Sequence, residues 1–415
     1  MTLPVTTHTV PEWGHLAIGE NGVSLDSAGR LHTLAQRETK RLRVPQPILT
    51  RTADPSLLAG QVVGVLAVQG ATVEILPKIE GEEPVTVRQA LTRMLAVAWN
   101  LPIADSEPAL LATQRADLLE ILIRLFADRL LVAVRRGLPH RYRQREDNLQ
   151  FLRGKLDIPR QLTRHTVRPD RLACRFEELS VDTPLNRVLK AAVVRLASVS
   201  GSDTNLRRLA ELSARFEFVG RSLAPAREPV RLDRTNTAFH RLYQLARALL
   251  GREWQSTTSG ASEGFGLLFP MNDLFEAFVG RTMRAVLSPR SVRLQDSGNY
   301  ALEGDSERVR LFALRPDIVV DGDIVIDTKW KQLNADDATL GVSQSDVYQM
   351  LAYARAYQAR RLVLLYPWHK ELPNLGTLRQ WKVPKSHTAF EIAAVDVRRP
   401  TAVGETLLEI IGERA

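Results

Sequence analysis

The segment that most constrains the fold of this chain is 314–330, with the sequence LRPDIVVDGDIVIDTKW. It has two β-branched runs on either side of a short polar turn. The pair Asp321-Gly322 is a strong hairpin signal, because glycine adopts positive φ at little cost. An aspartate flanks each run, Asp317 before the first and Asp327 after the second. The geometry of this hairpin decides whether the two carboxylates can meet.

The length of the turn sets the register of the predicted hairpin. A two-residue turn would place Asp317 and Asp327 on opposite faces, because side chains alternate along a strand. A three-residue turn, 321–323, would pair the two aspartates on one face. The other face would then carry Ile318, Val320, Ile324 and Ile326. We expect the three-residue turn, because it separates an acidic face from an apolar one.

Two residues after Asp327 extend the set of polar groups. Lys329 lies two positions on and points the same way as Asp327, whereas Thr328 points away and offers its backbone carbonyl. Carboxylate and carbonyl oxygens suit Mg²⁺ or Mn²⁺, and such an ion activates water and neutralises charge on a phosphate. The ammonium of Lys329 would stabilise the same charge. The hairpin therefore predicts a metal-dependent phosphodiesterase site; the alternative is a surface hairpin with solvated acids.

The flanking segments support the first interpretation. Periodicity and capping signals predict regular structure on both sides of the hairpin. The predicted elements are a helix over 271–287, strand-like runs at 292–295 and 308–314, a helix over 345–357 with Ser345 as its N-cap, and a buried strand over 361–366. The expected order is helix, three strands, helix, strand.

This order resembles the PD-(D/E)XK nuclease superfamily. Pro316-Asp317 is followed after ten residues by Asp327, and Lys329 stands two residues further on, as in the motif that names the superfamily. The resemblance implies an α/β nuclease core of order αβββαβ. It also implies hydrolysis of phosphodiester bonds in DNA with Mg²⁺ as the cofactor, Mn²⁺ being an alternative.

Three helical residues extend the resemblance. Gln349 and Tyr353 are neighbours on one helix face and are similar to the Gln-xxx-Tyr element of the RecB-like branch. Glu276 corresponds to the acid that many members carry on the first core helix. By spacing alone, Gln349 and Tyr353 are equally consistent with an ordinary helix surface. The alternative for Glu276 is a solvated helix charge, and the ligand role is slightly favoured. The resemblance implies metal binding by Asp317, Asp327, Thr328 and Glu276, and a catalytic set completed by Lys329, Gln349 and Tyr353.

Several segments narrow the resemblance to one family. Four of them, LLFPMNDLFE at 267–276, LRPD at 314–317, IDTKWK at 326–331 and SDVYQMLAY at 345–353, are together similar to McrC, the nuclease subunit of McrBC restriction systems. Upstream segments similar to the same family are ILPKI at 75–79, LRGKL at 152–156 and NRVLK at 186–190. The resemblance implies an endonuclease that restricts foreign DNA together with a McrB-like AAA+ GTPase ring, which it docks on and stimulates.

The composition of the chain limits the number of domains and the classes of protein to which it can belong. The chain has 415 residues and should form two or three domains. Lys and Arg number 56 against 47 Asp and Glu, and the net charge of +9 suits a polyanion such as DNA. The single cysteine, Cys174, excludes an intrachain disulfide, and the histidines lack the spacing of a zinc site. Without a signal peptide or a long apolar run, we expect a cytoplasmic protein with no membrane contact.

Three regions are expected along the chain. They are a mixed β-rich N-terminal domain over 1–110 that docks the AAA+ partner, a mainly helical region over 111–264, and the nuclease domain over 265–415. A Ser, Thr and Gly-rich stretch at 254–264 is the predicted linker. Further predicted elements are a hairpin of partly buried strands, 61–69 and 71–77, and helices near 85–99, 113–136, 184–199, 204–217 and 236–251.

Two basic clusters have more than one interpretation. The cluster Arg37, Lys40, Arg41 and Arg43 is a solvated basic face or a contact with the partner. The arginines of 135–145, interleaved with Tyr142, could bind nucleic acid, or form a loop that lies on acidic neighbours or contacts the partner. Gly154-Lys155 lacks the rest of a Walker A loop, so we expect this chain itself to bind no nucleotide.

Three functions are consistent with the sequence. The leading hypothesis is a Mg²⁺-dependent DNA endonuclease subunit of a McrBC-like type IV restriction system. The second is a stand-alone RecB-like repair nuclease that needs no partner. The third is a non-catalytic adaptor, in which the hairpin is structural and the chain activates a ring ATPase. The intact Asp317, Asp327 and Lys329 set makes the adaptor the least favoured.

Overall fold

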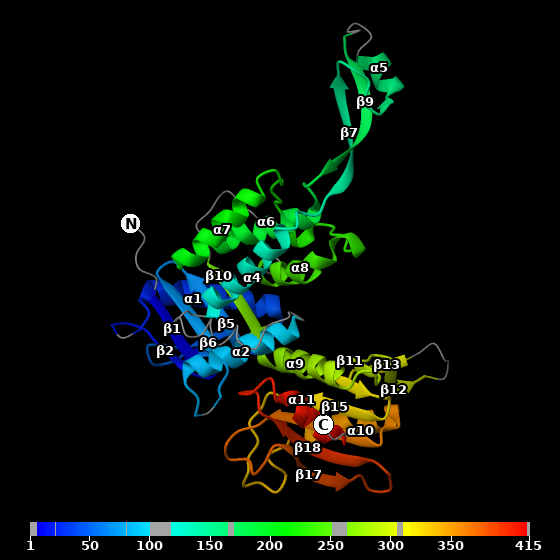
Figure 1. Cartoon of the computed structure of the whole chain (residues 1–415). Helices are drawn as coiled ribbons and strands as arrows, with labels where there is room; N and C mark the ends of the chain where they lie inside the picture. Colours follow the sequence, from blue (N-terminus) through cyan, green and yellow to red (C-terminus); the bar gives the residue numbers. More distant parts are fainter. Residues whose placement is uncertain are drawn as a thin grey trace. The chain divides into compact units, whose positions relative to one another are not determined.

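A computed structural model describes residues 6–20, 22–79, 81–99, 118–164, 170–250, 264–304 and 310–412. The chain divides into two compact units (Figure 1), one combining Met1–Ile121 with Ser262–Ala415 and the other comprising Leu122–Ala261. The predicted boundary near residue 110 and nearly all of the predicted linker 254–264 lie outside the described residues. The division into three regions therefore stays a prediction. No helix among the described residues is long and apolar enough to cross a membrane.

The N-terminal sheet of the first unit joins distant parts of the sequence. Its strands, in spatial order, are β1 (Thr6–Pro11), β6 (Ala71–Leu76), β5 (Val62–Val68) and β10 (Phe265–Pro270). β5 and β6 form the predicted hairpin, but they are buried almost throughout rather than partly. β10 pairs antiparallel with β5, and Gly64 at φ +130° permits this pairing, since a Cβ there would lie 2.0 Å from the Leu267 carbonyl oxygen.

Helices and a small sheet cover the N-terminal sheet. α1 (Leu25–Leu42) begins at Ser24, whose hydroxyl accepts a hydrogen bond from the Ser27 N–H, and packs on β5 and β10. α2 (Pro84–Ala98), a predicted helix, packs on β6. The small sheet has the order β2 (His15–Ala17), β4 (Ser56–Ala59), β3 (Leu49–Arg51). α4 (Leu118–Val134), the described part of the helix predicted over 113–136, contains the point at which the chain passes from the first unit to the second.

A six-stranded sheet forms the C-terminal part of the first unit. Its spatial order is β11 (Val292–Leu294), β14 (Ile318–Val320), β15 (Ile324–Thr328), β16 (Arg361–Pro367), β18 (Ala389–Val395) and β17 (Gly376–Lys382). β15, β16 and β18 run parallel, so their carboxyl ends meet at one edge. The predicted run 308–314 is β13 (Arg310–Leu314), but it pairs with β12 (Asn299–Glu303) in a separate sheet.

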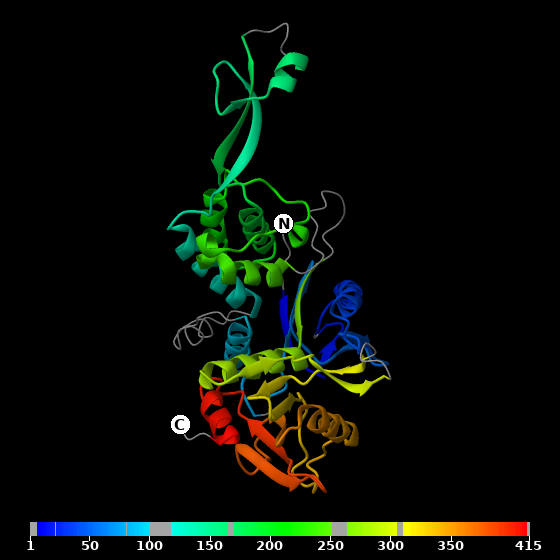
Figure 2. The same ribbon diagram turned by 90° about the vertical axis from the view of Figure 1, so that its right-hand side faces the viewer.

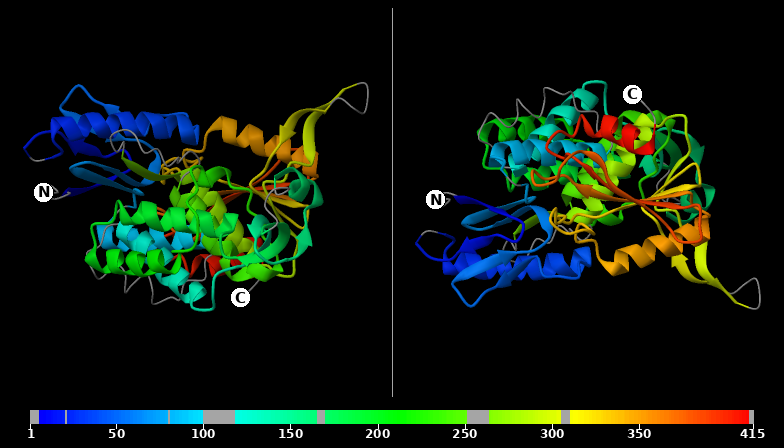
Figure 3. Two further views of the ribbon diagram at one scale, coloured as in Figure 1. Left: turned by 90° about the horizontal axis from the view of Figure 1, so that it is seen from above. Right: turned by 90° about the horizontal axis from the view of Figure 1, so that it is seen from below.

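Three helices pack on this sheet, as Figures 2 and 3 show. α10 (Gln344–Tyr357) packs on β15 and β16, while α11 (Val403–Ile411) lies on the opposite side and packs on β17 and β18. α9 (Met271–Val286) packs against α11, α2 and β15. Because β10 ends at Pro270 and α9 begins at Met271, the N-terminal sheet passes directly into the first helix of this region.

The second unit contains both helices and strands. The predicted helices are α6 (Pro184–Ala197), α7 (Asp203–Arg215) and α8 (Thr237–Leu250), with 3-10 turns η1 (Pro225–Arg227) and η2 (Arg234–Asn236) between the last two. A three-stranded sheet has the order β7 (Arg141–Leu149), β9 (Leu172–Ser180), β8 (Lys155–Leu156), with α5 (Ile158–Arg164) after β8. This sheet was not expected from the sequence.

The arginine-rich run 135–145 lies partly in strand β7 rather than in a loop. Three of its arginines form ion pairs: Arg141 with Asp233 at 2.6 Å, Arg143 with Asp182 at 2.8 Å and Arg145 with Glu178 at 2.5 Å. These pairs favour the interpretation that the run lies on acidic neighbours. In the N-terminal cluster, Arg41 is also paired, with Glu38 at 2.5 Å.

Candidate active site

The central hairpin has the predicted three-residue turn. β14 and β15 pair antiparallel with Ile318 opposite Ile326, which leaves 321–323 as the turn. The first two turn residues adopt positive φ, 48° and 87°. Continued by one residue, the register places Asp317 opposite Asp327, as predicted.

The face that carries the two aspartates is also apolar. Val319 and Val325 lie on this face by alternation and belong to a buried cluster with Met350 of α10. The expected separation of an acidic face from an apolar one was therefore wrong, because both faces of the hairpin are covered. The carboxylates lie at the end of a buried apolar surface, where their charges are poorly solvated.

Asp317 is held by the backbone and side chain of Thr328. The Thr328 N–H and its Oγ1 hydroxyl both donate to Asp317 Oδ2, each at 2.7 Å. The prediction that Thr328 offers the site only its backbone carbonyl was therefore wrong, because the side chain reaches the carboxylate across the strand edge. Burial raises the pKa of Asp317 to about 7, and the negative charges of Asp327 and Glu276 act in the same direction. The site thus holds more negative charge than its own cations neutralise.

Asp327 and Lys329 form a buried ion pair. The side chain of Asp327 is only 3% exposed, and its Oδ2 lies 2.7 Å from Lys329 Nζ. Burial raises the pKa of Asp327, although the nearby Lys329 opposes this shift. Burial alone would lower the pKa of Lys329, but Asp327 and Asp346 outweigh it, and the net shift is upward. Lys329 is therefore a firmly charged ammonium within the site.

Gln349 and Tyr353 connect α10 to this ion pair. Lys329 Nζ donates to Gln349 Oε1 at 3.2 Å, and Gln349 Nε2 donates to the Tyr353 hydroxyl at 2.8 Å. The Tyr353 hydroxyl in turn donates to the carbonyl of Arg315, two residues before Asp317, at 3.1 Å. The structure thus brings both predicted helix residues to the hairpin and makes them one hydrogen-bonded chain.

A further acid was missed in the sequence. Asp346 of α10 lies 3.5 Å from Lys329 Nζ and 3.0 Å from Lys331 Nζ. The N-cap of α10 is Ser343, not the predicted Ser345, and the Asp346 N–H donates to the Ser343 hydroxyl. This capping spacing, Ser followed three residues later by an acid, was the available signal that Asp346 lies in the first helical turn.

Glu276 lies near the two aspartates but has its own partner. Gln295 Nε2 donates to Glu276 Oε1 at 2.7 Å. Burial raises the pKa of Glu276, and the charges of Asp273 and Asp327 add to the effect. Among the described residues, no set of three or more His, Cys, Asp or Glu side chains converges as a ready metal site. Glu276 is therefore close to the pair without completing a three-carboxylate cluster.

The donor atoms present nevertheless fit a hard divalent cation. The Lys329 N–H donates to the Leu365 carbonyl of β16, whereas the Thr328 N–H donates to Asp317 on the β14 side. The N–H and C=O of one strand residue point the same way, so the Thr328 carbonyl faces the edge that carries Asp317. Mg²⁺ is typically bound by one or two carboxylates and keeps several waters, so two carboxylates and a carbonyl suffice.

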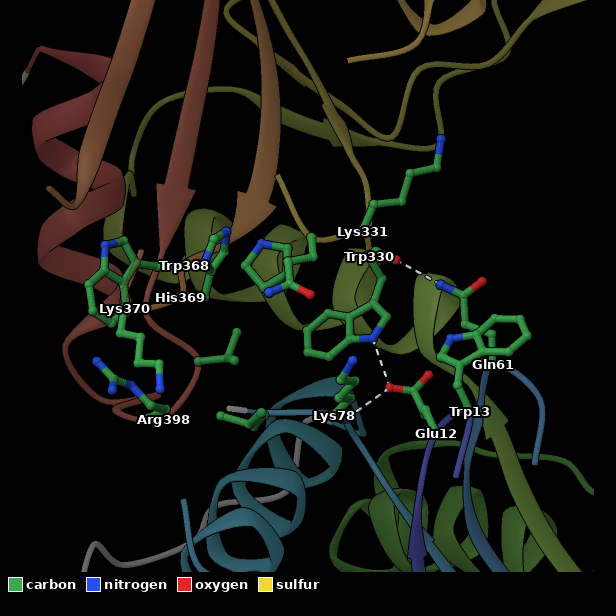
Figure 4. Close-up of a pocket in the computed structure, with 14 residues that line it drawn as sticks. Glu12, Trp13, Gln61, Lys78, Trp330, Lys331, Trp368, His369, Lys370 and Arg398 are labelled. Atoms are coloured by element: carbon green, nitrogen blue, oxygen red, sulfur yellow. Dashed lines mark hydrogen bonds between the residues drawn. The ribbon is translucent and has the colours of Figure 1, made fainter. Parts of the chain in front are cut away.

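Trp330, which follows Lys329 directly, attaches the site to the N-terminal sheet (Figure 4). Its indole Nε1–H donates to Glu12 Oε2 at 2.9 Å, and its carbonyl accepts from Gln61 Nε2 at 2.7 Å. The Trp330 N–H donates to Asn272 Oδ1 of α9 at 3.1 Å. Glu12, just after β1, was not selected from the sequence, because nothing local indicates a contact with a residue so distant in the chain.

Glu12 should make stability depend on pH. Burial raises its pKa from 4.5 to about 7, although hydrogen bonds from Trp330 and Lys78 oppose the shift. The folded state binds the Glu12 proton more tightly than the unfolded state does, so protonated Glu12 stabilises the fold. This stabilisation is fully present below the unfolded pKa of 4.5 and is lost as the pH rises through about 7.

In Glu12→Gln we expect this contribution to disappear. Relative to wild type, the variant should gain stability between about pH 5 and pH 8, by roughly 3 kcal/mol at most. Urea unfolding of both proteins at a series of pH values measures the difference. Parallel profiles would show that Glu12 titrates normally in the folded state.

The fold and site define a mixed α/β protein with a buried acid and lysine centre at the edge of a sheet. The chain belongs to the McrBC family, because the sequence model of that family matches residues 57–367. The family is described as "McrBC 5-methylcytosine restriction system component". The resemblance to the family that the sequence predicts is confirmed. No curated protein matches the chain.

Two solved structures from Thermococcus gammatolerans are similar to this chain. The first is a refined half-complex from a tetradecameric assembly of McrB AAA+ hexamers with bound McrC. The matched chain has a TM-score of 0.72 and 22% identity, with 98% of this chain and 100% of that chain covered. The second is a cryo-EM structure of the McrBC complex, with a TM-score of 0.55, 25% identity, and coverage of 68% and 88%.

Proposed function

We propose that this chain is the Mg²⁺-dependent DNA endonuclease subunit of a McrBC-like type IV restriction system, and that 265–415 forms a PD-(D/E)XK nuclease domain. The observation that carries the proposal is the buried meeting of Asp317 and Asp327, with Lys329 paired to Asp327. Two carboxylates held together where burial raises the pKa of each are unfavourable for folding. Such arrangements are concentrated at functional sites.

Asp317, Asp327 and the Thr328 carbonyl would hold Mg²⁺, or Mn²⁺ as an alternative. When bound, the ion supplies an activated water and charge neutralisation at the scissile phosphate. Glu276 would complete the shell, either directly after leaving Gln295 or through a bound water. The excess negative charge around Asp317 supports this assignment, since a divalent cation would neutralise it.

The remaining groups would act on the phosphate and on each other. The Lys329 ammonium lies beside Asp327 and would stabilise negative charge that develops on the phosphate. Gln349 accepts a hydrogen bond from Lys329 and donates to Tyr353, so this pair would hold the ammonium in position and shape the DNA-facing side. Asp346 is a second carboxylate that keeps Lys329 protonated.

The proposed partners are DNA and a McrB-like AAA+ GTPase ring. The net charge of +9 favours DNA, and the family match and the similar complexes of McrB hexamers with bound McrC support the ring. Nucleotide hydrolysis would take place in the ring, because Gly154-Lys155 in this chain lacks the rest of a Walker A loop.

Two surfaces are candidates for docking on the ring. The sequence predicts docking through 1–110, where the cluster around Arg41 lies. The second unit offers another surface, the segment 151–162 between β7 and β9, which exposes Phe151, Leu152, Leu156, Ile158 and Leu162. Several large apolar side chains exposed in one segment are typical of an interaction surface.

A double variant tests the second surface. We expect Phe151→Asp with Leu162→Asp to lower stimulation of the partner's GTP hydrolysis by about 10-fold, because buried apolar anchors dominate interface energy. Phe218→Asp, at a residue 81% exposed elsewhere in the same unit, is the control. Full stimulation by the double variant, together with a loss in Arg37→Glu with Lys40→Glu, would instead support docking through 1–110.

The proposed function is tested by cleavage of methylated and unmethylated plasmid in Mg²⁺, with and without the AAA+ partner and GTP. We expect methylation-dependent cutting only in the complete mixture. Equal cutting by the chain alone would instead support a RecB-like repair nuclease. Stimulated GTP hydrolysis without any cutting would support the adaptor.

A further inference from the structure

A cavity of about 340 Å³ lies beside the candidate active site in the first unit (Figure 4). Apart from Gln61, which precedes β5, its lining comes from the ends of parallel strands of both sheets and the segments that follow them. These strands are β1 and β6 in one sheet and β15, β16 and β18 in the other. Ligands of α/β proteins commonly bind outside the carboxyl ends of parallel strands. Trp330 lines the cavity and follows Lys329, so the cavity and the proposed nuclease centre share one segment.

Three buried polar atoms in this lining have no hydrogen-bond partner among the described residues. They are Glu12 Oε1, Trp368 Nε1 and His369 Nδ1, the last of which lies 3.9 Å from the Glu371 carboxylate. Nearly all buried polar groups in proteins are hydrogen-bonded, and ordered water often supplies the bond. These three atoms therefore give the wall of the cavity a polar interior.

Trp13 adds a strained aromatic surface. Its φ is +61°, a conformation that bulky residues rarely adopt, and its side chain is 47% exposed. The Trp13 N–H donates to the Ala59 carbonyl at 3.2 Å, and the Gly14 N–H donates to the Pro11 carbonyl at 2.9 Å. These two hydrogen bonds fix the backbone turn at residues 11–14. Strain of this kind persists mainly at functional positions. A glycine would fit the backbone better, so the indole itself is the feature to be explained.

Exposed cations complete the lining. Lys78 and Lys370 lie on the cavity, and within the described part of the chain neither has an ion-pair partner. Arg398 lies with its guanidinium 4.4 Å from the centre of the Trp368 ring and is paired with Asp396. A lysine that is not paired with a carboxylate can bind a phosphate, and a nearby aromatic ring can stack on a base. Together they suit a phosphate that is attached to an aromatic base.

We propose that this cavity binds one unstacked nucleotide of a DNA strand. The base would stack on Trp13, and phosphates of the strand would lie at Lys78 and Lys370. A volume near 340 Å³ is in the range of small-molecule sites. The choice of DNA as the ligand rests on the proposed function. The site would fix the strand next to the scissile phosphate.

The test is binding of a fluorescein-labelled single-stranded oligonucleotide to the full chain in EDTA, followed by anisotropy. We expect tighter binding of the single strand than of the same sequence as a duplex. Trp13→Gly should weaken single-strand binding by about 5-fold or more, the effect of one lost stacking contact. Because glycine adopts positive φ at little cost, the melting temperature of the Trp13→Gly protein should not fall below that of wild type. Trp13→Phe should retain most of the binding.

Matched controls separate the cavity from general basicity. Trp381→Ala and Lys382→Ala, at exposed positions of β17, should bind as wild type, whereas Lys78→Ala should reduce the salt dependence of binding. In wild type, an oligonucleotide carrying 5-iodouracil should photo-crosslink to the peptide of Trp13 or Trp368. Wild-type binding by Trp13→Gly, or an equal loss in Trp381→Ala, would overturn the proposal.

These outcomes are independent of cleavage. If Trp13→Gly binds normally while wild type cuts DNA, only the nucleotide site is wrong. If wild type binds the strand through Trp13 but cuts nothing in the complete mixture, the nuclease proposal fails and the binding site stands.

Discussion

Replacing Asp327 with alanine is expected to reduce DNA cleavage by about 1,000-fold or more without unfolding the protein. The rate should fall because the variant loses a proposed metal ligand and the anchor of the Lys329 ammonium, and losses of this kind are large. The fold should survive, because Lys329 keeps a second carboxylate, Asp346 at 3.5 Å, and because the ionised form of Asp327, whose pKa burial raises, itself opposes folding. Cleavage of methylated plasmid in the complete mixture and a thermal melt measure the two effects.

The control for this prediction is Asp336→Ala, which changes an exposed aspartate in the segment between β15 and α10. It should cut and melt as wild type. If Asp327→Ala melts as wild type and also cuts at the wild-type rate, Asp327 has no catalytic role. If it loses its cooperative melt, the carboxylate is needed for folding, contrary to the expected balance of charge and burial.

Replacing Lys329 with alanine should reduce cleavage by about 100-fold or more, the usual effect of removing one group that stabilises transition-state charge. Lys331→Ala is the matched control. Both lysines are paired with Asp346, at 3.5 Å and 3.0 Å, but only Lys329 also reaches Asp327, at 2.7 Å. Lys331→Ala should therefore lose only a few-fold at most in plasmid cleavage.

The two lysine variants should also differ in stability. Without Lys329, Asp327 and Asp346 lose their shared cation, and removing one partner of a buried ion pair costs about 3–5 kcal/mol. Mg²⁺ bound at Asp317 and Asp327 would replace part of that charge. Mg²⁺ should therefore raise the melting temperature of Lys329→Ala more than that of wild type. Equal losses of cleavage in both lysine variants would contradict a special role for Lys329.

The hairpin could be predicted because its geometry is local. The turn length fixed the pairing of Asp317 with Asp327, and strand alternation placed Lys329 beside Asp327. The helix positions of Gln349 and Tyr353 followed from a spacing of four residues, although only their resemblance to a family placed them at the site. Roles in catalysis for these residues stay predictions.

The parts that escaped prediction depend on contacts between distant segments. Glu12 reaches Trp330 only because β10 pairs with β5 of the N-terminal sheet and leads directly into α9, which packs on β15. Asp346 reaches Lys329 through the connection between β15 and β16. β7 and β9 carry charged side chains on exposed faces, so they lack the alternating apolar pattern by which strands are recognised.

The most direct test of the central claim is a Mn²⁺ titration, followed by electron paramagnetic resonance, of wild type and of a variant with Asp317→Asn and Asp327→Asn. Asparagine keeps the size of each side chain and removes its charge. We predict that wild type binds Mn²⁺ and that Mg²⁺ competes for the same site, whereas the double variant, still folded, does not bind it. Equal binding by both proteins, or none by either, would contradict a metal-dependent centre at this hairpin.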